Sequence, residues 1–195
     1  QYTLTLLDNS LPLPNFYRFF LQWLVDDTNL GLLIKSKGKS WDPVERDGLE
    51  GLVEQAKKTG RLYEMDRAAS PLDAALLTDF AVGITSLSAI ASAALKGARV
   101  LYLDFEKLDQ KNLESYSTFH SLGPKRCVFY DFESLKDSIL EYNTNPNSNP
   151  HLGDASPILD RLDPFRDGKA SQRIGEYITW YLEGLEENLE KNTAL

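Results

Sequence analysis

Residues 78–104, TDFAVGITSLSAIASAALKGARVLYLD, contain two apolar runs with an alanine-rich stretch between them. The runs at 80–84 and 99–104 are almost continuously apolar, which is typical of strands buried on both faces of a parallel sheet. The stretch 86–96 has helical character, and Gly97 ends it, because glycine is favoured just beyond a helix. The segment therefore predicts a strand, a crossover helix and a second strand.

The same alternation continues on both sides of this segment. We expect further strands at 2–7, 30–34, 61–66 and 126–131, and further helices at 15–27, 44–60, 70–77 and 132–142. Strands that alternate with helices in this way pair in parallel, and their right-handed crossovers place helices on both faces of the sheet. The sequence therefore predicts an α/β fold, a Rossmann-like three-layer αβα sandwich with a mostly parallel sheet.

We interpret residues 1–195 as a single Rossmann-like domain, with 143–168 as a loop and 169–190 as a C-terminal helix. In that helix the apolar side chains form one stripe, and such a stripe is more often part of a core than a cofactor-binding element. Its members are Ile174, Tyr177, Ile178, Tyr181, Leu182 and Leu185.

The chain opens on a strand-like segment without a methionine, so we expect it to be a piece of a longer protein.

Composition disfavours several classes of protein. The net charge of −8 argues against nonspecific binding of nucleic acid, which needs a basic surface. The single cysteine, Cys127, rules out an internal disulfide, and its apolar neighbours indicate a buried structural thiol. The two histidines, His120 and His151, lie in polar stretches, so we do not expect a Cys/His metal site. No apolar run is long enough to span a bilayer.

Ligands of parallel α/β sheets bind at the carboxyl ends of the strands. The most distinctive strand end here holds Gly83, Thr85, Ser86 and Ser88, at the start of a predicted helix. Free N–H groups and a partial positive charge at a helix N-terminus favour phosphate, and the three hydroxyls add donors. The alternative is that one hydroxyl only caps the helix, while the others allow close packing. The residues alone leave both interpretations open.

Basic and acidic residues follow two other strands. Lys35, Ser36 and Lys37 come directly after a buried strand, where a lysine can neutralise a phosphate. The alternative is a solvated loop. Asp66 and Asp104 could accept hydrogen bonds from sugar hydroxyls, or they could simply form turns.

Three common motifs are absent. The chain has no G-x-G-x-x-G after its first strand, no G-x-x-x-x-G-K-[ST] and no G-x-S-x-G. A dinucleotide dehydrogenase, a P-loop nucleotidase and an α/β-hydrolase are therefore disfavoured.

The segment 78–104 resembles the nucleotide-sugar-binding part of the C-terminal half of GT-B glycosyltransferases. There too a strand meets a Ser/Thr-rich turn, then a helix, a glycine and another strand. The tail at 159–185, LDRLDPFRDGKASQRIGEYITWYLEGL, is similar to the ends of bacterial surface-polysaccharide biosynthesis proteins of that kind. Together with LLIKSKGKS at 32–40, the resemblance spans most of the chain.

The resemblance implies roles for particular residues. Lys35 or Lys37 corresponds to a basic residue near the donor phosphates, and residues 64–66 correspond to a loop near the nucleobase. The Ser/Thr turn, with Thr85, Ser86 and Ser88, corresponds to a phosphate contact. Many retaining members pair two glutamates across this turn and helix, but residues 86–96 contain no acid, so that subclass is disfavoured.

The function that the resemblance implies is binding of a UDP- or CMP-linked sugar by a glycosyltransferase of the hexosyl or Kdo/sialyl type. We expect no cofactor and no metal, and no activity from the isolated domain. The implied partners are an N-terminal half of the same enzyme and a glycan or lipid-linked acceptor, in the cytoplasm or at the inner face of the membrane. The catalytic residues stay unassigned. The alternatives are a flavodoxin-like interaction module and half of a nucleotide-sugar epimerase.

Overall fold

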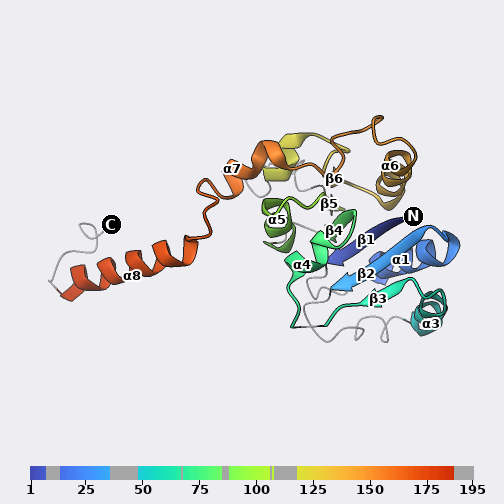
Figure 1. Cartoon of the computed structure of the whole chain (residues 1–195), viewed down its shortest axis with the longest axis horizontal. Coiled ribbons are helices and arrows are strands. Elements are labelled where there is room, and N and C mark those ends of the chain that lie inside the picture. The colour runs from blue at the N-terminus through green and yellow to red at the C-terminus, as the bar shows by residue number, and fades with distance from the viewer. Residues whose placement is uncertain are drawn as a thin grey trace. The chain divides into compact units, whose positions relative to one another are not determined.

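The computed structural model describes residues 1–7, 14–35, 48–66, 68–84, 88–105, 107 and 118–186. Within these ranges six strands form one sheet in the order β3-β2-β1-β4-β5-β6, and every neighbouring pair is parallel (Figure 1). They are β1 (Tyr2–Leu7), β2 (Leu30–Lys35), β3 (Leu62–Glu64), β4 (Phe80–Ile84), β5 (Val100–Leu103) and β6 (Val128–Phe129). The predicted α/β fold is confirmed.

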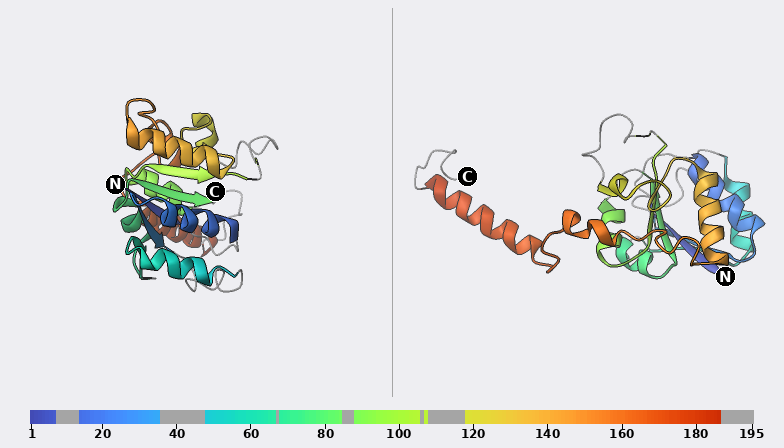
Figure 2. Two further views of the ribbon diagram at one scale, coloured as in Figure 1. Left: turned by 90° about the vertical axis from the view of Figure 1, so that its right-hand side faces the viewer. Right: turned by 90° about the horizontal axis from the view of Figure 1, so that it is seen from above.

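Helices cover both faces of this sheet (Figure 2). One face carries α1 (Pro14–Asp26), α3 (Glu50–Lys58) and α6 (Phe132–Thr144). The other carries α4 (Pro71–Leu76), α5 (Ser88–Leu95) and the 3-10 turns η3 (Thr118–Leu122) and η4 (Ser156–Ile158), with the short helix α7 (Leu159–Leu162) after them. The three predicted layers are therefore present.

Alternating side chains of each strand supply the two cores. In β1, Leu4 and Leu6 pack with α1, while Leu7 belongs to the cluster of α4 and α5. Fully burying one such side chain stabilises the fold by roughly 2 kcal/mol. Thr5 is the polar residue buried in this strand, and its hydroxyl donates to the Ala74 carbonyl oxygen at 2.8 Å. Continuously apolar strands are the expected result of a sheet that is covered on both sides.

Two helices begin at residues whose side chains cap them. The Ser70 hydroxyl accepts from the Leu72 N–H at 3.1 Å, and Pro71 follows it at the first helical position. The Asp131 carboxylate accepts from the Ser134 N–H at 2.7 Å at the start of α6. The stretch 143–168, expected as a loop, contains the end of α6 and the short elements η4 and α7.

The chain divides into two compact units, 1–162 and 163–195. The second contains α8 (Ala170–Glu186), in agreement with the predicted C-terminal helix, but its apolar stripe is not buried within this unit. Five members of the stripe are exposed by 39–60 %, and Tyr181 is half-buried; the five are Ile174, Tyr177, Ile178, Leu182 and Leu185. A unit this small has too little chain to build a core of its own, so burial of the stripe stays a prediction. Within the described ranges, none of the helices is both long and apolar enough to cross a bilayer.

Gly153 should be the most sensitive glycine of the first unit. Its φ is +73°, and a Cβ placed on it would lie 2.9 Å from the Arg99 Cβ and 3.2 Å from the Val100 nitrogen. Its carbonyl oxygen also accepts the Val100 N–H at 2.8 Å, at the start of β5. We expect Gly153→Ala to lower the free energy of unfolding by about 3 kcal/mol, measured by urea denaturation.

Gly60→Ala is the matched control. Gly60 has a φ of +69°, but nothing lies within 4 Å of a Cβ placed on it. This substitution should therefore cost only the left-handed strain, about 1 kcal/mol. Equal losses for the two variants would show that the contact between Gly153 and Arg99 has no energetic importance.

Candidate functional site

The strand order places a topological switch point between β1 and β4. The chain leaves β1 toward β2 and β3 on one side and later returns to β4, β5 and β6 on the other. After β1 the chain continues into α1 on one face, and after β4 it continues into α5 on the other. In open α/β sheets, ligands bind outside the carboxyl ends of the strands at such a point. The Ser/Thr turn, for which the sequence leaves phosphate binding and helix capping open, follows β4.

The strand register brings two predicted site residues into one row. Leu7 pairs with Lys35 of β2 on one side and with Gly83 of β4 on the other. Lys35 and Gly83 are thus two strand spacings apart, about 10 Å. Both lie on the face that carries α4 and α5, because Leu7 in the same row belongs to that cluster. The lysine strand end and the Ser/Thr strand end therefore share one rim of the sheet.

Lys35 is buried, with a residue exposure of only 6 %. A buried ammonium is stable only when it is paired or hydrogen-bonded. Its position is suited to holding charge close to the strand ends rather than to reaching into solvent. Ser36 and Lys37, which were predicted beside it, lie outside the described residues.

The N-terminus of α5 is the second component of this rim. Gly83 is buried at the end of β4, and Ser88, the first residue of α5, is exposed. The first N–H groups of a helix lack partners within the helix, and the aligned peptides place a partial positive charge there. Ser88 therefore lies where an anion would be stabilised. Thr85 and Ser86 lie outside the described residues.

Asp66 is farther away and already engaged. It follows β3, the edge strand, three positions from β4 in the sheet. Its carboxylate accepts from the Ala68 N–H at 2.7 Å, and its carbonyl oxygen accepts from the Ala69 N–H at 3.1 Å. These hydrogen bonds form a turn, which was the alternative interpretation of Asp66 to a sugar contact. The side chain is exposed, and the structure does not bring it next to Gly83 or Ser88.

The structure adds a pair of residues that the sequence analysis did not join. The carboxylate of Asp104, one residue past β5, lies 2.9 Å from the His120 Nε2. The two side chains are only 1 % and 8 % exposed, and the Tyr102 ring meets the imidazole edge-on at a centroid distance of 5.6 Å. Strand alternation in VLYLD places Asp104 on the face of Tyr102, but nothing in the sequence identifies a partner sixteen residues away.

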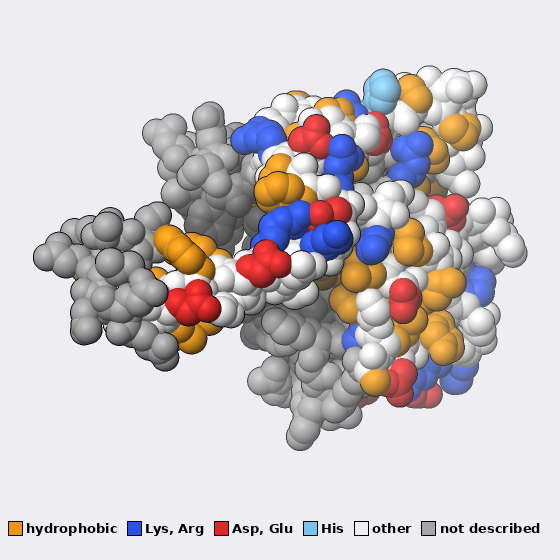
Figure 3. All heavy atoms as spheres, turned by 60° about the vertical axis from the view of Figure 1, so that its left-hand side comes forward, with side chains coloured by type: hydrophobic (Ala, Val, Ile, Leu, Met, Phe, Trp, Pro, Cys, Tyr) orange, Lys and Arg blue, Asp and Glu red, His pale blue; other side chains and the backbone are white. Residues whose placement is uncertain are grey.

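The electrostatics of the described surface are mixed. On the face shown in Figure 3, basic groups alternate with acidic and apolar side chains, and among the described residues no broad basic area forms. Nowhere in the described part of the chain do three or more His, Cys, Asp or Glu side chains gather as a metal site requires. Cys127 is fully buried, and this burial raises the pKa of its thiol to about 12.

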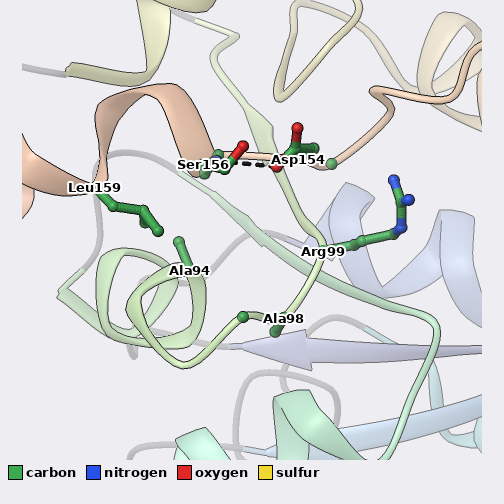
Figure 4. Close-up of a pocket in the computed structure, with 9 residues that line it drawn as sticks. Ala94, Ala98, Arg99, Asp154, Ser156 and Leu159 are labelled. Atoms are coloured by element: carbon green, nitrogen blue, oxygen red, sulfur yellow. Dashed lines mark hydrogen bonds between the residues drawn. The ribbon is translucent and has the colours of Figure 1, made fainter.

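A separate hollow of about 170 Å³ lies at the amino end of β5 (Figure 4). Ala94, Ala98 and Leu159 form its apolar wall, and Asp154 and Ser156 lie at its rim. Burial opposes ionisation of Asp154, but hydrogen bonds from Ser156 and the charge of Arg126 prevail and hold the pKa of Asp154 below its usual range.

This hollow is a poor candidate for a binding site. In Figure 4 the Arg99 side chain points away from the other labelled residues. Its guanidinium instead donates to the Pro150 and Leu152 carbonyl oxygens and stacks on the Tyr142 ring at 4.9 Å. The hollow also lies at the opposite edge of the sheet from the switch point. We therefore assign it a packing role.

The comparisons with known proteins give no match. No family model matches the chain, and neither a curated protein nor a solved structure is significantly similar to it. The candidate site therefore rests on the geometry of the strand ends.

Proposed function

We propose that this chain is the donor-binding domain of a glycosyltransferase that uses a UDP- or CMP-activated sugar. The observation that supports it best is the shared row of Lys35, Leu7 and Gly83 at the switch point, beside the N-terminus of α5. This rim combines a lysine, a glycine that lets a ligand approach the backbone, and a helix end that favours phosphate. The resemblance of the sequence to GT-B enzymes points to the same function.

The proposed chemistry is displacement at the anomeric carbon of the donor. The leaving nucleotide gains negative charge in the transition state, and preorganised positive dipoles stabilise that charge. The N-terminus of α5 and the lysines near β2 supply this stabilisation in the proposal, without a metal ion. The catalytic base and the acceptor site belong to a second half of the enzyme.

The proposed partner is a second Rossmann-like half, and the proposed setting is bacterial surface-polysaccharide synthesis in the cytoplasm. The large apolar side chains on α8, exposed within their own unit, support a partner surface, because such side chains are costly to leave in water. Trp180, 47 % exposed, is the kind of aromatic residue that anchors interfaces.

Isothermal titration of the chain with UDP and CMP tests the proposal. We expect at least one of them to bind with a dissociation constant below about 1 mM, and no turnover of nucleotide sugars by the domain alone. A flavodoxin-like interaction module would not respond to either nucleotide. Absence of heat and of any thermal shift at millimolar concentrations of both would contradict the proposal.

A further inference from the structure

The pair formed by Asp104 and His120 lies one strand from the junction of β4 and α5. Ile84 pairs with Leu103, so Asp104 is the first residue beyond the ladder between β4 and β5. Tyr102, on the same face as Asp104, packs in one cluster with Ile90 of α5. The pair is therefore on the rim, and on the face, where the first turn of α5 lies.

The contact with Asp104 determines which imidazole nitrogen holds the proton. A carboxylate can only accept hydrogen bonds, so the nitrogen that faces it, Nε2 of His120, must be the donor at 2.9 Å. In a neutral imidazole the other nitrogen, Nδ1, then has a lone pair and can only accept. Asp104 thus orients His120 so that its Nδ1 is an acceptor.

This acceptor has no partner among the described residues. The His120 side chain is 8 % exposed, and its Nδ1 is buried without a hydrogen bond in the described part of the chain. A buried polar nitrogen without a partner is costly, and functional groups are a recurring exception. The exposed 8 % of the side chain places the imidazole just below the surface.

We propose that His120 Nδ1 accepts a hydrogen bond from a hydroxyl of the nucleotide sugar bound at this rim. The inference rests on the proposed function and extends it. Phosphate oxygens cannot donate, so an acceptor-only nitrogen does not select them. In a nucleotide sugar the phosphates lie between two hydroxyl-bearing rings, the ribose and the transferred sugar. β5, which Asp104 follows, lies one strand spacing, about 5 Å, from β4. In the proposal, His120, in contact with Asp104, reaches one of these two rings.

Nitrogen-15 NMR of the histidine-labelled chain tests this contact, because the protein has only two histidines. The probes are UDP, CMP, UDP-glucose, CMP-N-acetylneuraminate and pyrophosphate. We expect the His120 Nδ1 resonance to move upfield with a nucleotide or a nucleotide sugar. His151, whose side chain is 66 % exposed near Asp154 at the other edge of the sheet, should stay unchanged. Pyrophosphate should leave both resonances in place.

The set of probes distinguishes a ribose hydroxyl from a hydroxyl of the transferred sugar. It also distinguishes failure of this contact from failure of the proposed function. A shift with UDP or CMP assigns the ribose, and a shift only with the sugar-linked compounds assigns the transferred sugar. Binding detected by calorimetry without movement of His120 would overturn the contact and leave the proposed function intact. An equal shift with pyrophosphate would overturn it too. Absence of binding by every probe would refute the proposed function, and the contact with it.

One variant distinguishes a ligand contact from a pair that is only structural. His120→Gln keeps an N–H near the Nε2 position for Asp104 but has no acceptor at Nδ1. We expect His120→Gln to keep nearly the wild-type melting temperature and to bind at least fivefold more weakly. Wild-type affinity in this variant would overturn the contact. If the variant does not fold, the NMR titration of the wild-type chain decides.

Discussion

Replacing Ser88 with aspartate should reduce nucleotide affinity at least tenfold without lowering stability. Affinity and stability should respond differently, because the new carboxylate interacts with two different groups, the bound phosphate and the helix dipole. A carboxylate in the first turn of α5 interacts favourably with the helix dipole, by about 0.3–1 kcal/mol. The same carboxylate repels a phosphate bound at that helix end. Two like charges about 4 Å apart near a protein surface repel by up to about 4 kcal/mol, and exposure of Ser88 reduces this. A tenfold loss corresponds to about 1.4 kcal/mol.

Ser88→Asn is the matched control, since it has the same shape as the aspartate variant and no charge. Titration calorimetry with UDP or CMP at low salt should give nearly wild-type affinity for Ser88→Asn. The gap between the two variants should narrow as salt is added, because exposed charges are screened. Equal affinities of the aspartate and wild-type chains would place the phosphate somewhere other than the N-terminus of α5.

The sheet was predictable because its signals are local. The strand 80–84 and the helix after it are visible in the sequence as an apolar run and an alanine-rich stretch that ends at Gly97. Parallel pairing follows from their alternation, and it places the strand ends on one rim. The order of strands was not predictable, since the pairing of β1 with β4 depends on contacts between residues more than seventy positions apart.

The site was only partly predictable for the same reason. Lys35 was recognised as a strand-end lysine, but its burial depends on the helices that cover that face. Asp104 was predicted to form a turn or to contact a sugar, whereas its carboxylate contacts His120, which lies in a polar stretch of the sequence. Neither the burial of Lys35 nor the contact between Asp104 and His120 follows from spacing or composition. A contact between side chains that are far apart in the sequence can be seen only in the tertiary structure.

Arg61→Ala should lower the free energy of unfolding by about 3 kcal/mol, although Arg61 is not at the proposed site. Its guanidinium donates to three backbone carbonyl oxygens: Leu24 at 2.8 Å, Asp27 at 2.6 Å and Leu30. Those carbonyls belong to the last turn of α1, the connection after it and the first residue of β2. Each polar group that loses its partner costs about 1–3 kcal/mol when buried, and less where water replaces the arginine.

Two further variants test whether this loss of stability comes from the several N–H donors of the planar Arg61 guanidinium. Arg18→Ala removes the same side chain from the exposed face of α1 and should change the free energy of unfolding, measured in urea, by less than about 0.5 kcal/mol. Arg61→Lys keeps the charge but presents one compact ammonium instead of a planar fork. It should recover less than half of the loss, because one ammonium cannot reach carbonyls on both α1 and β2. Full recovery by lysine would mean that charge alone stabilises this corner, and that the carbonyls find other partners.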